Sequence, residues 1–125
     1  MDLKFLVVDD SVTMRRIVIN SLKSLSYSDF VEAGDGKEAL EKLGADNTIN
    51  FVITDWNMPV LSGLELVKAI RSNETLNKLP ILMVTTRGVK EDILEALQAR
   101  VNNYVVKPFT PQILKEKIDQ IVQMV

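Results

Sequence analysis

The sequence predicts an α/β domain with a doubly wound parallel sheet, and two observations support this prediction. Five short apolar runs, rich in β-branched residues, alternate with amphipathic stretches along the whole chain. No repeat, linker or low-complexity tract interrupts the alternation. Strand–helix units in this order form a parallel sheet that helices cover on both faces.

The strands are predicted from the apolar runs. They are Lys4–Val8, Asp29–Ala33, Phe51–Thr54, Pro80–Val84 and Asn103–Val106. In doubly wound sheets, ligands bind beyond the carboxyl ends of the strands, near the point where the winding reverses. The residues that follow the strands are therefore the first candidates for function.

The helices are predicted from apolar periodicity and from capping residues. The first covers about Thr13–Leu25, with an apolar face made by Met14, Ile17, Val18, Leu22 and Leu25. Capping-box spacing predicts where the second and third helices begin, at Asp35 with Glu38 and at Ser62 with Glu65.

The last two helices differ in the strength of their signals. The fourth, near Val89–Gln98, has the weakest pattern. The fifth has a clear start, because Thr110 is a good cap and Pro111 suits the first helical position. Its predicted buried stripe is Leu114, Ile118, Ile121, Val122 and Val125.

Length and composition restrict the class of protein. With 125 residues, 46% of them hydrophobic, the chain can build one core, so we expect one domain over residues 1–125 with no attached output domain. The N-terminal apolar run is too short for a signal peptide, and no segment is long enough to span a bilayer. Because cysteine is absent, the sequence fits a reducing cytoplasm.

Missing residue types and charge exclude several functions. Without cysteine or histidine, the chain has no disulfide, no thiolate or histidine metal site, no Ser-His-Asp triad and no phosphohistidine of its own. The formal net charge is −2, and the basic residues are spread along the chain, which gives no basic surface for nucleic acid or membrane. We expect protein partners, and a monomer that binds neither nucleic acid nor membrane.

Three acids follow two of the predicted strands: Asp9 and Asp10 follow the first and Asp55 the third. If those strands are neighbours, the three carboxylates share one crevice. Two unit charges about 4 Å apart repel by about 4 kcal/mol at an effective dielectric of about 20, so a cation or proton must relieve the cluster. Hard oxygen ligands suit Mg²⁺. The alternative is that the acids only cap helices and solvate loops.

Two further residues favour a phosphoryl-binding site. Lys107 and Thr85 end the fifth and fourth strands and would project into the same crevice. A carboxylate nucleophile, a divalent cation, an ammonium and a hydroxyl together bind and transfer a phosphoryl group. Alone, each would be read as a surface lysine or a strand-end hydroxyl. Neither the Gly-rich nucleotide-binding loops nor a Gly-x-Ser-x-Gly motif is present.

The sequence resembles response regulator receiver domains, and within them the single-domain chemotaxis regulators. The motifs that carry the resemblance are Val7-Val8-Asp9-Asp10, Thr13-Met14-Arg15-Arg16, Thr54-Asp55-Trp56-Asn57-Met58-Pro59, Gly63, Met83-Val84-Thr85 and Tyr104-Val105-Val106-Lys107-Pro108-Phe109. The resemblance covers essentially the whole chain. It implies a flavodoxin-like fold with five helices and the strand order 2-1-3-4-5.

The resemblance also implies the chemistry. Asp55 is the phospho-acceptor, supplied by a chemotaxis histidine kinase, and Mg²⁺ is the cofactor. The implied metal ligands are Asp10, Asp55 and the main-chain carbonyl of Asn57, while Asp9 acts through a metal-bound water. Such a protein is a signalling switch rather than an enzyme, and a phosphatase is a possible further partner.

The switch residues are implied in the same way. Thr85 turns toward the phosphoryl group, Lys107 pairs with it, and Tyr104 moves from an outward to an inward rotamer. The Lys107–Pro108 bond is expected to be cis. The change remodels the surface of the fourth helix, fifth strand and fifth helix, which would bind a flagellar motor switch protein.

Four residues depart from the family pattern. Arg87 replaces an acid of the enteric chemotaxis protein and can reach the rim of the site, and Thr86 is bulkier than usual. Ser26 and Arg100 stand where the family often has glycine; a left-handed conformation at Arg100 would cost about 1 kcal/mol.

Two other functions are alternatives. A small Mg²⁺-dependent aspartyl-phosphate phosphohydrolase would turn over many phosphomonoesters, whereas a switch is labelled stoichiometrically; no Asp-x-Asp motif or cap insertion favours it. A binding-only scaffold with an idle pocket would not need all the proposed site residues.

Overall fold

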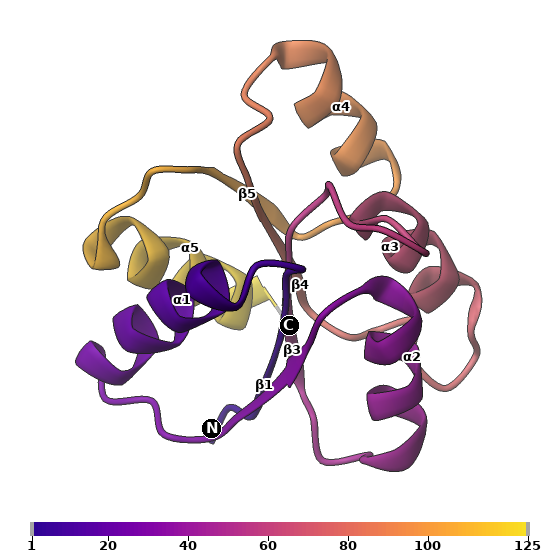
Figure 1. Cartoon of the computed structure of the whole chain (residues 1–125), viewed down its shortest axis with the longest axis horizontal. Coiled ribbons are helices and arrows are strands. Elements are labelled where there is room, and N and C mark those ends of the chain that lie inside the picture. Colours follow the sequence, from indigo (N-terminus) through magenta and orange to yellow (C-terminus); the bar gives the residue numbers. More distant parts are fainter. Residues whose placement is uncertain (1, 125) are drawn as a thin grey trace.

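The predicted alternation of strands and helices is confirmed in a computed structural model, which describes residues 2–124 (Figure 1). The strands are β1 (Phe5–Val8), β2 (Phe30–Ala33), β3 (Phe51–Thr54), β4 (Ile81–Thr85) and β5 (Asn103–Val106). They pair in parallel in the predicted order β2-β1-β3-β4-β5. The helices are α1 (Val12–Ser24), α2 (Gly36–Ala45), α3 (Gly63–Ser72), α4 (Lys90–Gln98) and α5 (Pro111–Met124).

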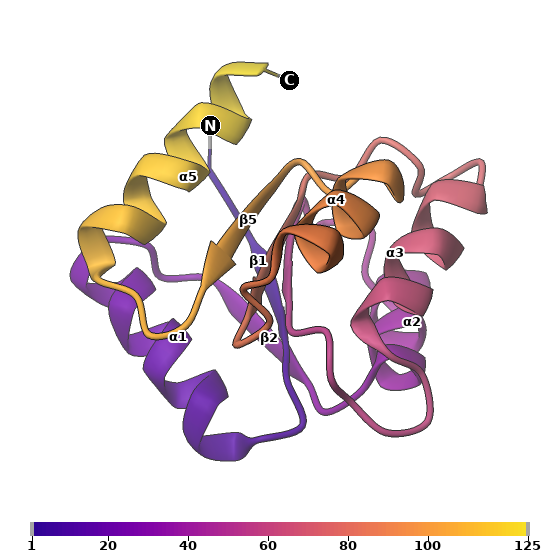
Figure 2. The ribbon, with the colours of Figure 1, turned by 90° about the horizontal axis from the view of Figure 1, so that it is seen from above.

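The sheet lies between two layers of helices (Figure 2), and a hydrophobic core fills the space on each side of it. Helices α1 and α5 cover one face, and α2, α3 and α4 cover the other. Successive side chains of a strand point to opposite faces, so Leu6 and Val8 of β1 enter one core while Phe5 and Val7 enter the other. Both faces are covered, and β1, β3 and β4 are buried along their whole length. No helix within residues 2–124 is long and apolar enough to cross a membrane.

Most of the predicted helix starts are confirmed. Ser62 and Glu65 form a reciprocal capping box on α3. Thr110 accepts a hydrogen bond from the Ile113 amide at the start of α5. The second box is only half formed: Asp35 caps the amide of Glu38, but the Glu38 carboxylate accepts from the Gly34 amide instead of from Asp35.

The apolar face predicted for α1 is wrong at one position. Ile17 is 44% exposed, whereas Ile19 is buried. Because α1 packs against α5 as well as against the sheet, its buried side is turned toward Val18, Ile19 and Leu22. In the predicted stripe of α5, Leu114, Ile118 and Ile121 are buried and Val122 packs at the edge; Val125 lies outside the described residues.

Among residues 2–124, three residues other than glycine have a left-handed backbone. Ser26 (φ 75°) and Arg100 (φ 76°) follow α1 and α4, as the family's glycines at these positions suggested. The third, Val60 (φ 67°), was not predicted; a left-handed conformation costs a residue with a Cβ about 1–2 kcal/mol. The Lys107–Pro108 bond is cis, as predicted.

Candidate phosphorylation and metal site

The acidic residues meet because β1 and β3 are neighbours. Val8 and Thr54 are partners in the register, so the next residues, Asp9 and Asp55, leave the sheet side by side. One carboxylate oxygen from each of Asp9, Asp10 and Asp55 lies within 4.8 Å of the others. The structure therefore brings the three predicted carboxylates together at the carboxyl end of the sheet.

Lys107 reaches the same cluster from the end of β5. Its Nζ lies 2.8 Å from Oδ2 of Asp9 and 3.3 Å from Oδ2 of Asp55. The side chains of Lys107 and Asp9 are almost fully buried, that of Asp55 is 13% exposed, and Asp10 is exposed. One ammonium cannot balance three ionised carboxylates, and buried charge is costly unless it is paired. The cluster therefore has a surplus of negative charge that a bound cation would balance.

Main-chain contacts fix the carboxylate of Asp55. Oδ1 of Asp55 accepts from the Trp56 amide at 2.6 Å, and the Thr54 hydroxyl donates to the Asp55 carbonyl at 2.8 Å. Helix α3 begins directly against this segment: a Cβ on Gly63 would lie 1.8 Å from the Asp55 carbonyl oxygen, so only glycine fits. Asp55 is therefore held by backbone on both sides, and its Oδ2 is directed at Lys107.

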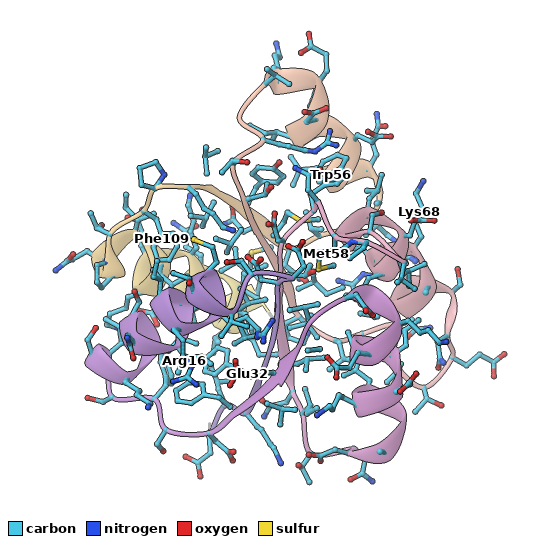
Figure 3. All side chains as sticks on the ribbon, in the orientation of Figure 1. Arg16, Glu32, Trp56, Met58, Lys68 and Phe109 are labelled. Carbon is cyan, nitrogen blue, oxygen red and sulfur yellow. The ribbon has the colours of Figure 1, made fainter. Side chains whose placement is uncertain are left out.

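A cleft of about 470 Å³ opens over the cluster. Its polar base includes Asp9, Asp10, Asp55 and Lys107, and its wall is largely apolar, formed by Met14, Ile17, Pro108 and Phe109. Figure 3 labels Phe109, which lies in the segment between β5 and α5. The cleft therefore gives access to Asp55 from solvent.

The other predicted site residues lie around the cluster without joining it. Thr85 is fully buried at the end of β4, and its hydroxyl accepts from the Arg87 amide at 3.4 Å rather than contacting Asp55. The carboxamide of Asn57 is exposed and accepts from Arg87 Nε at 3.0 Å. Neither residue's predicted role is tested by these contacts.

Tyr104 is in the inward position. Its side chain is 8% exposed, and its hydroxyl donates to the main-chain carbonyl of Arg87 at 2.8 Å. Burial, with a smaller contribution from the Asp92 carboxylate, raises the pKa of Tyr104 to about 12. The outward position that the resemblance implied for the resting state is not the one seen here, and the movement itself stays a prediction.

Sequence reasoning assigned no role to Arg15. Its Nη1 donates to the Asp9 carbonyl, and its Nε lies 2.9 Å from Oε1 of Glu32. This arginine therefore fixes the backbone of the acidic segment from α1. Its place in the Thr13-Met14-Arg15-Arg16 motif was the only signal available.

The donors present fit a hard divalent cation. All three are carboxylates, and the chain has neither histidine nor cysteine to offer an imidazole or thiolate ligand. Mg²⁺ usually takes one or two protein carboxylates and keeps several waters. The exposed position of Asp10 leaves room for those waters.

Comparisons with known proteins agree with this arrangement. The sequence model of the family described as the response regulator receiver domain matches residues 5–119. The chain belongs to the response regulator receiver family. This receiver domain is 54% identical to chemotaxis protein CheY1 of Helicobacter pylori (strain ATCC 700392 / 26695), with 96% of this chain and 97% of the relative covered.

Further relatives support the same family and fold. The domain is 50% identical to the chemotaxis protein CheY of Pseudomonas aeruginosa, with 98% of each chain covered. Among solved structures, the chemotaxis response regulator CheY4 of Vibrio cholerae matches with a TM-score of 0.86 at 36% identity, over 97% of this chain and 99% of that chain. The predicted family and the flavodoxin-like strand order are confirmed.

Proposed function

We propose that this receiver domain is a chemotaxis response regulator that a histidine kinase activates by phosphorylating Asp55. One observation carries the proposal: the Lys107 ammonium lies 3.3 Å from Asp55 in a cluster of three carboxylates that opens to a cleft. Similarity to chemotaxis proteins over nearly the whole chain supports the same function.

The proposed reaction is a transfer from nitrogen to oxygen. A carboxylate oxygen of Asp55 attacks the phosphorus of a kinase phosphohistidine; the P–N bond breaks, and its electron pair returns to the imidazole nitrogen. Lys107 neutralises charge on the phosphoryl oxygens, which is the main task of a protein in phosphoryl transfer. Attack of water on phosphorus later releases inorganic phosphate and restores the carboxylate.

The proposed cofactor is Mg²⁺. Asp10, Asp55 and the main-chain carbonyl of Asn57 would hold it, and Asp9 would act through a bound water. When present, the ion supplies positive charge against the phosphoryl oxygens. The surplus charge of the acidic cluster supports this assignment, because these carboxylates lie together with only one lysine.

The signal would leave through the α4–β5–α5 surface. A phosphoryl group carries about −1.5 to −2 charges and accepts strong hydrogen bonds, so Thr85 and Lys107 gain new contacts that favour the inward position of Tyr104 over the outward one. The surface exposes apolar side chains suited to binding a flagellar motor switch protein: Val89, Leu94, Leu97, Val106 and Ile113.

The proposal includes the setting in which the protein works. Residues 1–125 would act as one receiver domain, in the cytoplasm, as a monomer. Its partners would be a chemotaxis histidine kinase and the flagellar motor switch protein, with a dedicated phosphatase as a further candidate. It would be a switch labelled once per cycle rather than an enzyme acting on a separate substrate.

The deciding experiment uses acetyl phosphate as phosphoryl donor, with and without Mg²⁺, and intact mass as the readout. We expect one phosphoryl group per chain, dependent on Mg²⁺ and lost in Asp55→Asn. Asp29→Asn, which changes an exposed acid away from the cleft, is the matched control and should label normally. Labelling that survives Asp55→Asn would reassign the acceptor, and many turnovers of a phosphomonoester would favour the phosphohydrolase.

A further inference from the structure

Arg87, two residues beyond β4, connects the acceptor loop to the proposed output surface. Its side chain and main chain together contact residues of the loop after β3, of α4, of β5 and of β4 itself: Trp56, Asn57, Asp92, Tyr104 and Thr85. No metal ligand or phosphoryl chemistry requires this set of contacts.

The guanidinium holds the loop that follows Asp55. Its Cζ lies 4.5 Å from the centre of the Trp56 ring, and its Nε donates to Oδ1 of Asn57 at 3.0 Å. A planar cation stacked on an indole while donating from its edge is an arrangement that arginine makes and lysine cannot reproduce in full. Trp56 is 6% exposed under this cover.

The same guanidinium reaches α4. Its Nη1 lies 3.5 Å from Oδ2 of Asp92, in the first turn of the helix. Helix α4 has few other attachments: Ala96 is its one buried residue, and Val89 provides no side-chain cap. Figure 3 shows Trp56 between the centre of the molecule and α4.

The main chain of Arg87 holds the switch residues. Its carbonyl accepts from the Tyr104 hydroxyl at 2.8 Å, and its amide donates to the Thr85 hydroxyl at 3.4 Å. The side-chain contacts fix this backbone in place. Tyr104 therefore keeps its inward partner only while the Arg87 segment keeps its position.

We infer that Arg87 is a latch: its guanidinium ties the loop after Asp55 to α4 and thereby holds Tyr104 inward before any phosphoryl group is added. Arg87 is a positioning residue, since it acts through Tyr104 and α4. The inference deepens the proposed function and rests on it in one respect, that α4 and Tyr104 belong to the output surface. Its consequence is that part of this surface is formed in advance of phosphorylation.

The test measures how often Tyr104 opens in the unphosphorylated, metal-free chain. The probe is N-acetylimidazole, which acetylates accessible tyrosine, with peptide mass spectrometry as the readout. The chain has two tyrosines, and Tyr27 is an internal reference because it is partly buried and packs against Phe5, at the margin of the core between the sheet and α1 and α5. The acetylation rate of a tyrosine that must open follows the population of the open state.

In Arg87→Met we expect the acetylation rate of Tyr104 to rise about tenfold, which corresponds to about 1.4 kcal/mol in the opening equilibrium, while that of Tyr27 stays constant. Arg87→Lys keeps a cation over Trp56 but loses the several N–H donors of the planar guanidinium. The acetylation rate of Tyr104 in this variant should therefore lie between those of the native chain and Arg87→Met. Lys68→Met removes the same charge from the exposed side of α3 and should change neither tyrosine (Figure 3).

Equal Tyr104 rates in the native chain and Arg87→Met would overturn the latch. A parallel rise at Tyr27 would also overturn it, because the substitution would then loosen the fold as a whole. Circular dichroism confirms folding, and Arg87→Lys supplies a second variant. Since neither metal nor phosphoryl donor is present, failure of Asp55 to label would contradict the proposed function without changing this result.

Discussion

The two ends of one sheet use charged residues in opposite ways. At the amino end, Lys4 pairs with Asp46 at 2.7 Å, and Arg71 is surrounded by main-chain carbonyls. At the carboxyl end, three carboxylates lie together and a single lysine pairs with two of them. Charges whose partners all lie within the chain stabilise the fold, whereas a surplus of like charge is kept only where a ligand relieves it.

Arg71 is an example of a charged side chain whose partners all lie within the chain. Its guanidinium donates to the carbonyls of Arg100, Asn77 and Leu79 and to Oδ1 of Asn102, at 2.7–3.0 Å. It thereby joins α3 to the loops before β4 and β5. Burial, with repulsion from Arg100, lowers the pKa of Arg71 from its ordinary value. Every acceptor belongs to the chain, so nothing here calls for a ligand.

The comparison is tested most strongly by Lys107→Met at the carboxyl end. Phosphoryl transfer from acetyl phosphate should slow about 100-fold, because one charged group that stabilises the transition state is lost. The rate is followed by intact mass at saturating Mg²⁺. Lys68→Met is the control and should label at the native rate; an equally fast Lys107→Met would remove Lys107 from the proposed chemistry.

At the amino end the same kind of substitution should affect stability and not labelling. Arg71→Met should lower the free energy of unfolding by about 2–3 kcal/mol, because several carbonyls lose a charged donor. Urea unfolding gives the value, and Lys78→Met, an exposed neighbour, is the control. If Arg71→Met also slowed labelling of Asp55 well below its melting temperature, the two ends would not be independent.

Asp10→Asn should raise the free energy of unfolding of the metal-free protein, whereas Arg71→Met should lower it. Removing one carboxylate from the cluster relieves repulsion with Asp9 and Asp55, so the metal-free protein should gain about 1 kcal/mol, reduced from the buried-pair value because Asp10 is exposed. The measurement is urea unfolding in a chelator at low salt, repeated with Mg²⁺, which should stabilise the native chain more than the variant. A loss of stability without metal would show that the cluster is already balanced.

The sequence predicted the sheet and the acidic cluster because both depend on local signals. Apolar runs located all five strands, and parallel strands place the residues after them at one end of the sheet. That rule alone was enough to predict that Asp9, Asp55 and Lys107 lie close together. Details that depend on packing could not be predicted from the sequence. Ile17 was predicted to be buried and is exposed, whereas Ile19 is buried, because α5 also covers α1.

Contacts between distant loops were the other limit. The sequence indicated that Arg87 could reach the site, but not that it stacks on Trp56 or that its carbonyl holds Tyr104. The left-handed backbone at Val60 also had no signal, since a β-branched residue is a poor choice for that conformation. These features are set by neighbours far apart in sequence, which apolar periodicity does not encode.

The smallest expected effect concerns Lys4 and Asp46. The hydrogen bond from Lys4, followed by those from the Thr48 hydroxyl and amide, lowers the pKa of Asp46 from 3.8 to about 2. Because the folded pKa lies below the unfolded one, the stabilisation is present above pH 3.8 and is lost as the pH falls through about 2. The pair is exposed to solvent, so the change in stability is small.

Lys4→Met should raise the pKa of Asp46 part of the way to 3.8, since the bonds from Thr48 remain. An NMR titration of the Asp46 carboxyl carbon measures the shift, with Lys68→Met as the control. An Asp46 that titrated at 3.8 in the native chain would mean that the ion pair does not form in solution. One of the ion pairs that distinguish the amino end of the sheet from the carboxyl end, where carboxylates are in excess, would then be absent in solution.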